Sequence, residues 1–110
     1  MKIIIKTTNI DLTPSFKAYI EKKLSYVPRL LKRLDEKDAA EMRVEAARIT
    51  RHHKSGDVFR AEINLDLPGR VLRAEARAGD AREAIDLVKN ILWMEIVKYK
   101  TRFSAKRRAK

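Results

Sequence analysis

The sequence predicts one α+β domain with the order strand, helix, three strands, helix, in which a four-stranded sheet carries both helices on one face. Two segments repeat apolar residues every three or four positions, as amphipathic helices do. The strand segments are either β-branched or alternate apolar and polar residues, so each has one apolar face. A two-layer β-α-β-β-β-α arrangement would bury all of these faces. We expect residues 1–103 to form the domain and residues 104–110 a basic, flexible tail.

The first strand is predicted over residues 2–8, because Ile3, Ile4 and Ile5 form a β-branched run. We expect this strand to lie inside the sheet. If it pairs with the next strand, the helix between them makes a crossover, and the pair should be parallel.

The first helix is predicted to begin at Thr13-Pro14, where a hydroxyl cap precedes a proline at the first helical position. Pro28 conflicts with the helical pattern, so we expect a kink or break there. The residues predicted to be buried follow at spacings of three and four: Phe16, Ile20, Leu24, Val27, Leu31 and Leu34.

Residues 42–47 alternate as a half-buried strand, and residues 52–57 read as a loop. The alternation is clearest from Val58 to Leu67, after which Pro68-Gly69 fits the two central places of a type II turn. A tight hairpin should therefore return the chain into a strand with Leu72, Ala74 and Ala76 facing inward.

The last helix is predicted from Asp80 to Phe103, with Asp80 as N-cap and Glu83 completing a capping box. Its predicted buried stripe is Ala81, Ile85, Val88, Leu92, Ile96 and Tyr99.

The composition points to a polyanionic partner, since 26 Lys and Arg against 15 Asp and Glu leave a net charge of +11. No apolar run is long enough to span a bilayer, and residues 1–5 are too short for a signal-peptide core. We therefore expect a cytoplasmic protein that does not bind membranes. The lack of Cys excludes disulfides, thiolate catalysis and Cys-rich zinc sites.

Catalytic patterns are lacking: the sequence has no glycine-rich phosphate loop, nucleophile elbow or HExxH motif. The pair His52-His53 is too small a donor set for a stable metal site, and a plain loop explains it better. The outward carboxylates Glu62, Asp66 and Glu75 alternate with Arg60, Arg73 and Arg77, and cross-strand ion pairs explain them better than acid-base chemistry. We expect no enzymatic activity, metal or cofactor.

Nucleic acid binding is the main functional prediction. A solvent-exposed helix face usually mixes Lys and Arg with Asp and Glu, whereas on these helices the cations greatly outnumber the acids. The predicted RNA-binding residues are Lys22, Lys23 and Arg29 in the first helix, Arg82, Lys89, Lys98, Lys100 and Arg102 in the last, and Lys106, Arg107 and Arg108 in the tail.

Five apolar residues of the last helix lie off its buried stripe: Leu87, Ile91, Trp93, Met94 and Val97. We expect Ile91 to line the groove between the helices. Leu87 and Met94 point nearly opposite to the stripe, which together with Trp93 indicates a possible protein contact, such as a weak homodimer. Trp93 could alternatively stack on a nucleobase, although packing is the favoured interpretation.

Several segments, in this order and spacing, resemble the ribosome hibernation-promoting factor and ribosome-associated inhibitor family, also called the sigma modulation protein family. The resemblance covers residues 1 to about 103 and is carried by these pieces: the opening strand with Leu12-Thr13-Pro14, then Tyr19-Ile20-Glu21-Lys22-Lys23-Leu24, Leu67-Pro68-Gly69, Leu72-Arg73-Ala74-Glu75, Ala84-Ile85-Asp86 and Lys98-Tyr99-Lys100.

The resemblance implies a fold similar to double-stranded RNA binding domains and a cytoplasmic translation inhibitor of the stress response. Such a protein would bind rRNA of the small ribosomal subunit in the decoding channel and block tRNA and mRNA sterically. Lys22, Lys23, Lys98 and Lys100 match basic positions of the family. The chain resembles the short members, which have no C-terminal dimerising domain.

The chain departs from the family in the middle of the last helix. Ile91 and Met94 stand where family members are commonly basic, and Glu95 replaces a frequent glutamine. Two alternatives therefore stay open: a general binder of structured RNA, and a dimerising interaction module that uses this apolar middle.

Overall fold

The computed structural model describes residues 1–33, 39–49 and 58–108, and of residues 103–108 it describes the backbone. The elements are β1 (Lys2–Thr8), α1 (Pro14–Lys23), α2 (Tyr26–Leu30), β2 (Glu41–Ile49), β3 (Val58–Leu67), β4 (Arg70–Ala78) and α3 (Ala81–Arg108). This order confirms the predicted α+β fold, with the predicted first helix divided into α1 and α2. The predicted loop at residues 52–57 and the seam residue Leu34 lie outside the described residues.

The four strands form one mixed sheet in the order β1-β2-β3-β4. The β1–β2 pair is parallel, as the crossover connection predicts, and the other pairs are antiparallel. Gly69 has φ +79°, which suits the third place of a type II turn, and Leu67 pairs directly with Arg70 across it. The predicted hairpin is thus confirmed.

The position of β1 corrects our expectation, because β1 lies at an edge of the sheet and not inside it. Ile3 and Ile5 pair with buried residues of β2 and Ile4 lies on the opposite face, yet Ile3 and Ile4 are 40% and 38% exposed, as expected for an edge strand. A run of three isoleucines makes both faces apolar but does not specify a second neighbour. Lys2 and Lys6 flank the run, and charges of this kind protect free strand edges from unwanted pairing.

The predicted first helix begins as expected: the backbone N–H of Phe16 donates to Thr13 Oγ1 at 3.1 Å. Its break is real but lies at Leu24 and Ser25, ahead of Pro28. The proline ring clashes with the carbonyl four residues earlier and supplies no N–H to it, and that carbonyl belongs to Leu24. The Leu24 oxygen accepts instead from the N–H of Val27 at 3.1 Å, which is a tighter turn.

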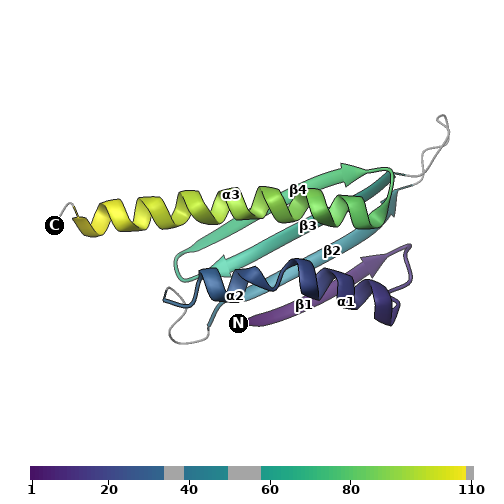
Figure 1. The fold of residues 1–110 in the computed structure, drawn as a ribbon, viewed down its shortest axis with the longest axis horizontal. Coiled ribbons are helices and arrows are strands. Elements are labelled where there is room, and N and C mark those ends of the chain that lie inside the picture. The colour runs from purple at the N-terminus through teal and green to yellow at the C-terminus, as the bar shows by residue number, and fades with distance from the viewer. Residues whose placement is uncertain (34–38, 50–57, 109–110) are drawn as a thin grey trace.

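The helices share one face of the sheet, with α3 crossing β3 and β4 and with α1 and α2 lying over the β1–β2 half (Figure 1). The predicted seams meet between the layers: Ile20, Leu24, Ile85 and Leu92 are each at most 1% exposed. They belong to one core cluster with Val44 and Ile63 of the sheet. Within the described residues no polar or charged residue is buried, so apolar packing joins the two layers.

Helix α3 is longer than predicted. Asp80 caps its start, accepting from the N–H of Glu83 at 3.3 Å, but the helix ends at Arg108 instead of Phe103. Residues 104–108 contain Ala, Lys and Arg, which favour helix, and no Gly or Pro to end it. Its buried stripe stops at Ile96, so the last turns extend past the sheet (Figure 1). The flexibility of residues 104–110 stays a prediction. None of the described helices has the length and apolar character needed to cross a bilayer.

Candidate nucleic-acid interface

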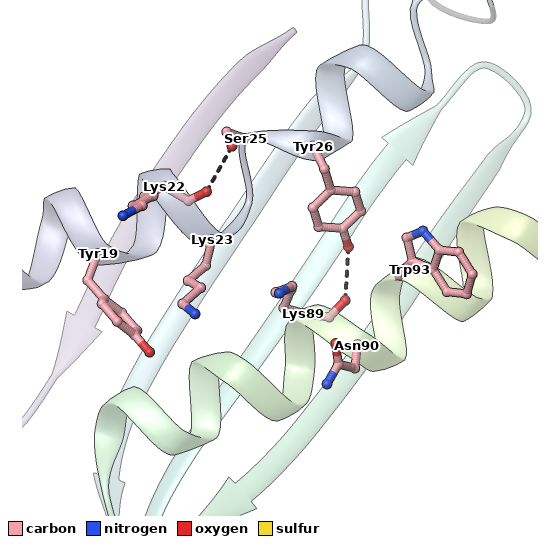
Figure 2. A pocket seen from close by; sticks show the side chains of 8 residues that line it. All are labelled: Tyr19, Lys22, Lys23, Ser25, Tyr26, Lys89, Asn90 and Trp93. Carbon is pink, nitrogen blue, oxygen red and sulfur yellow. Dashed lines mark hydrogen bonds between the residues drawn. The ribbon is translucent and has the colours of Figure 1, made fainter.

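A groove runs between α1 and α2 on one side and α3 on the other, with a volume of about 630 Å³ (Figure 2). All three helices that flank it contribute buried residues to the core on the sheet, so the core fixes their separation. The lining residues are Tyr19, Lys22, Lys23, Ser25, Tyr26, Lys89, Asn90 and Trp93.

Tyr19 joins α1 to α3 at one end of the groove. Its hydroxyl donates to Asp86 Oδ1 at 2.6 Å, and Lys23 Nζ lies 3.5 Å from the same oxygen. The hydrogen bond from Tyr19, helped by the charge of Lys23, holds the pKa of Asp86 below its usual range. The same bond, aided by burial, raises the pKa of Tyr19.

Tyr26 makes the second connection across the groove. Its hydroxyl donates to the backbone carbonyl of Lys89 at 2.9 Å (Figure 2). Burial raises the pKa of Tyr26 to about 12. Ser25 donates to the carbonyl of Lys22 at 2.8 Å and so fixes the turn between α1 and α2. These hydroxyls hold the walls together and leave the lysines to set the charge of the groove.

Three of the predicted RNA-binding residues line this groove: Lys23 extends from α1 toward α3, Lys89 lies on α3, and Lys22 lies at the rim with its side chain directed away from α3 (Figure 2). Lys23 pairs with Asp86. In the described part of the chain, no carboxylate lies within ion-pair distance of Lys22 or Lys89. The groove therefore carries excess positive charge on fixed walls, which suits phosphate groups.

Two further predicted residues serve as connections between helices. Arg82 donates to Ser15 Oγ at 2.9 Å and lies 4.7 Å from the centre of the Tyr19 ring. Lys100 Nζ donates to the carbonyl of Leu30 at 3.0 Å, at the end of α2. Both side chains therefore stabilise the contact between α1, α2 and α3.

Three other predicted cations with described side chains, Arg29, Lys98 and Arg102, are not among the residues that line the groove. Lys98 is 3.7 Å from Glu95 on its own helix, and Arg29 and Arg102 are exposed elsewhere. The structure places Lys106, Arg107 and Arg108 in the last turns of α3, where the backbone alone is described. The part of these three side chains in an RNA-binding site therefore stays a prediction.

Of the apolar residues off the stripe, Leu87 is 42% exposed, and Trp93 and Met94 are each 50% exposed. Trp93 lines the groove. Ile91 packs half-buried against the core instead, which corrects its expected place. Because residues two apart in a helix point about 200° apart, Ile91 lies on the side of α3 away from Lys89.

The open face of the sheet carries the predicted ion pairs in a modified arrangement. Asp66 pairs with Arg43 of β2 at 3.1 Å, and Arg60 lies 3.3 Å from Glu45, both across strands. The other two pairs lie within a strand: Arg60 with Glu62 at 3.9 Å, and Arg77 with Glu75 at 3.7 Å. The described residues contain no cluster suited to a metal ion, and His52-His53 lies outside them.

Sequence reasoning assigned no role to Tyr19, Tyr26 and Asn90. A signal was available for the tyrosines, because Tyr19 and Tyr26 are seven residues apart and flank Lys22 and Lys23 on one side of the helix. Their partners could not be found this way, since Tyr19 and Asp86 are 67 residues apart in the chain.

Two ribosome hibernation promotion factors align with most of this chain. The chain is 29% identical over 99 residues to the ribosome hibernation promotion factor of Deinococcus radiodurans, and 30% identical over 100 residues to that of Staphylococcus aureus. These alignments cover 90% and 91% of this chain but 49% and 48% of the relatives. The chain therefore spans about half the length of the curated relatives it matches.

Two solved structures share the fold. A ribosomal subunit interface protein from Coxiella burnetii superposes with a TM-score of 0.69 at 23% identity, covering 92% of this chain and 99% of that one. The N-terminal domain of Thermus thermophilus Protein Y gives 0.61 at 28% identity, covering 90% and 99%. The family model described as sigma 54 modulation protein / S30EA ribosomal protein matches residues 3–104. The predicted resemblance is thus confirmed: the chain belongs to the sigma 54 modulation protein / S30EA ribosomal protein family.

Proposed function

We propose that this chain binds rRNA of the small ribosomal subunit and holds the ribosome inactive by occupying the decoding channel. Its relatives from Deinococcus and Staphylococcus are named for ribosome hibernation. The alignments, which cover about half of those relatives, include all the residues of this chain that line the groove. In this proposal the chain binds the rRNA and fills the channel by its volume, and it carries out no chemical step.

The observation that carries the proposal is the excess of cations on the helix layer. Residues 14–33 and 81–102 hold eleven Lys and Arg against four Asp and Glu. Cations that neutralise phosphates release counterions, which gives strong and salt-sensitive binding to RNA. Because Lys22, Lys23 and Lys89 stand on helices fixed by the core and by two tyrosine hydroxyls, little freedom would be lost on binding.

Steric blocking follows from this rigidity. A protein held by phosphates along one layer occupies the space of a competing RNA without needing to change shape. Binding to the subunit and binding of tRNA or mRNA should then exclude one another.

The test is sedimentation of purified small subunits with the full chain at low salt, with and without bound tRNA and mRNA. We expect the protein to pellet with empty subunits and to be displaced once both RNAs are bound. A protein that stays in the supernatant with empty subunits contradicts the proposal.

A competitor arm separates this function from general binding of structured RNA. A plain RNA duplex in excess over subunits should leave the pelleted protein unchanged. Release by this excess of duplex would favour the general RNA binder.

A further inference from the structure

We propose that the groove takes an unpaired nucleotide of the RNA, with its base stacked on Trp93 and its phosphates on Lys23 and Lys89. This inference rests on the proposed function and specifies which kind of RNA element enters the site. It would make Trp93 a specificity-determining residue that distinguishes unpaired from paired RNA.

Trp93 is placed to receive a ligand. Its side chain is half exposed although it is the largest apolar residue of α3, and it lines the same groove as the lysines (Figure 2). Within the described residues, the cations found over aromatic rings, Lys23 and Arg82, both lie over Tyr19. Among the described residues, therefore, no cation occupies the half-exposed Trp93 ring, whereas Tyr19 already has two cations over its ring.

The backbone beneath Trp93 is held in position. Lys89 lies about one turn before Trp93, about 6 Å along the axis, and its carbonyl accepts the hydrogen bond from Tyr26. An aromatic platform on a fixed backbone loses little entropy when a base stacks on it. Lys89 precedes Trp93 along α3 and Lys23 lies on α1 across the groove, so a strand lying in the groove would meet cations from both walls before the platform (Figure 2).

Asn90 adds a group that could read the base. It is exposed on the groove wall, and within the described part of the chain its side-chain amide makes no hydrogen bond. An amide offers both donors and an acceptor to a base edge. Edges and faces are accessible together when a base is unpaired, since a duplex hides the faces in its stack.

A protein partner fits Trp93 less well. Adjacent helical residues point about 100° apart, so Trp93 and Met94 face different directions. Met94 shares its direction with Leu87, seven residues earlier, on the exposed side of α3. Trp93 instead faces a groove of positive charge, which repels a second copy of this basic chain and attracts phosphate.

The test uses the fluorescence of Trp93, which is the single tryptophan of the chain. The full chain is titrated with an eight-nucleotide RNA free of self-complementarity, and separately with the same RNA annealed to its complement. We expect the single strand to quench the emission strongly and the duplex to leave it nearly unchanged. Equal quenching by both, or by neither, overturns the proposal.

Affinity of variants for the single strand gives a second measure. Trp93→Ala should weaken binding by about 5- to 100-fold, as expected for one stacked base, and Trp93→Tyr should retain most of it. Met94→Ala is the matched control, since that neighbour is equally exposed but faces away, and it should bind like the wild type. Equal affinity of Trp93→Ala and wild type overturns the stacking role.

Sedimentation separates this failure from failure of the proposed function. If wild type and Trp93→Ala pellet equally with small subunits, the stacking inference is wrong while ribosome binding stands. If the wild type itself does not pellet, the proposed function is wrong. Emission that depends on protein concentration without RNA would assign Trp93 to self-association and also overturn the inference.

Discussion

The open face of the sheet and the helix layer carry the same types of charged residue, but the charges nearly cancel on the open face and leave a net positive charge on the helix layer. On the open face, six Lys and Arg stand against five Asp and Glu: Lys2, Lys6, Arg43, Arg60, Arg73 and Arg77, with Glu41, Glu45, Glu62, Asp66 and Glu75. Most of these arginines pair with a carboxylate on a neighbouring position. On the helix layer, eleven cations meet four acids, and Lys22 and Lys89 lie beside a groove.

The difference teaches that placement matters more than composition. On the open face Glu45, Glu62 and Glu75 lie directly opposite one another, and opposite charges meet instead diagonally across strands or two positions apart in one strand, where they neutralise one another. The helices bring their cations together from segments far apart in the chain, and the acid nearest the groove, Asp86, is engaged by Tyr19 and Lys23. The net charge of the molecule is therefore concentrated on one side.

The largest difference between the two faces should appear when lysines or arginines on each face are replaced by glutamate. We expect Lys22→Glu with Lys89→Glu to weaken binding to small subunits on the order of 100-fold or more and to reduce its salt dependence. Arg73→Glu with Arg77→Glu changes the net charge equally on the open face and should weaken binding only a few-fold. Sedimentation at several salt concentrations measures both, and similar losses for the two variants would refute a binding role specific to the helix layer.

A smaller effect should come from alkaline pH acting on Tyr26. Its pKa is raised to about 12 in the fold, against about 10 when unfolded, so the neutral form is favoured by folding. This contribution is fully present below pH 10 and is lost as the pH rises toward 12. No tyrosine lies on the open face, so the effect belongs to the helix layer.

Denaturant unfolding of the wild type and Tyr26→Phe checks this prediction. Between pH 9 and pH 12 the wild type should lose roughly 2 kcal/mol more of its unfolding free energy than the variant does. Near pH 7 the variant should be less stable by about 1 kcal/mol, because the hydrogen bond to Lys89 is gone. Parallel pH profiles for the two proteins would contradict the assignment.

The smallest expected effect is the contribution of an ion pair on the open face to the free energy of unfolding. Arg43 and Asp66 form the shortest ion pair among the described residues, at 3.1 Å, but their side chains are 53% and 36% exposed. A double-mutant cycle with Arg43→Ala and Asp66→Ala should give a coupling of about 0.2–1 kcal/mol that falls with added salt. Subunit binding should not change. A coupling well above this range would mean that the open face contributes more to stability than solvent screening allows.

The sequence was sufficient for features that depend on local chemistry. The alternation of Val58 to Leu67, the turn at Pro68-Gly69 and the cap at Thr13 are each set by a few neighbouring residues, and the structure confirms all three. The edge position of β1 was missed because three isoleucines measure apolar character and do not specify strand order.

The candidate site was predictable in its residue types but not in its geometry. Lys22, Lys23 and Lys89 were predicted from their excess charge, yet Lys100 and Arg82 turned out to connect helices. The Tyr19–Asp86 and Tyr26–Lys89 contacts join positions 67 and 63 residues apart. No local spacing contains that information, because it arises from how the two helices dock on the sheet.

The last turns of α3, which extend past the sheet after Ile96, affect how the molecule diffuses. The molecule measures 56 × 27 × 19 Å and has a radius of gyration of 15.5 Å, whereas a globular chain of this length would have about 13 Å. Such a rod-like outline slows diffusion and raises the apparent mass on a sizing column. An early-eluting peak could then be mistaken for a dimer, so the oligomeric state of this protein is better decided by light scattering or sedimentation equilibrium, which report mass independently of shape.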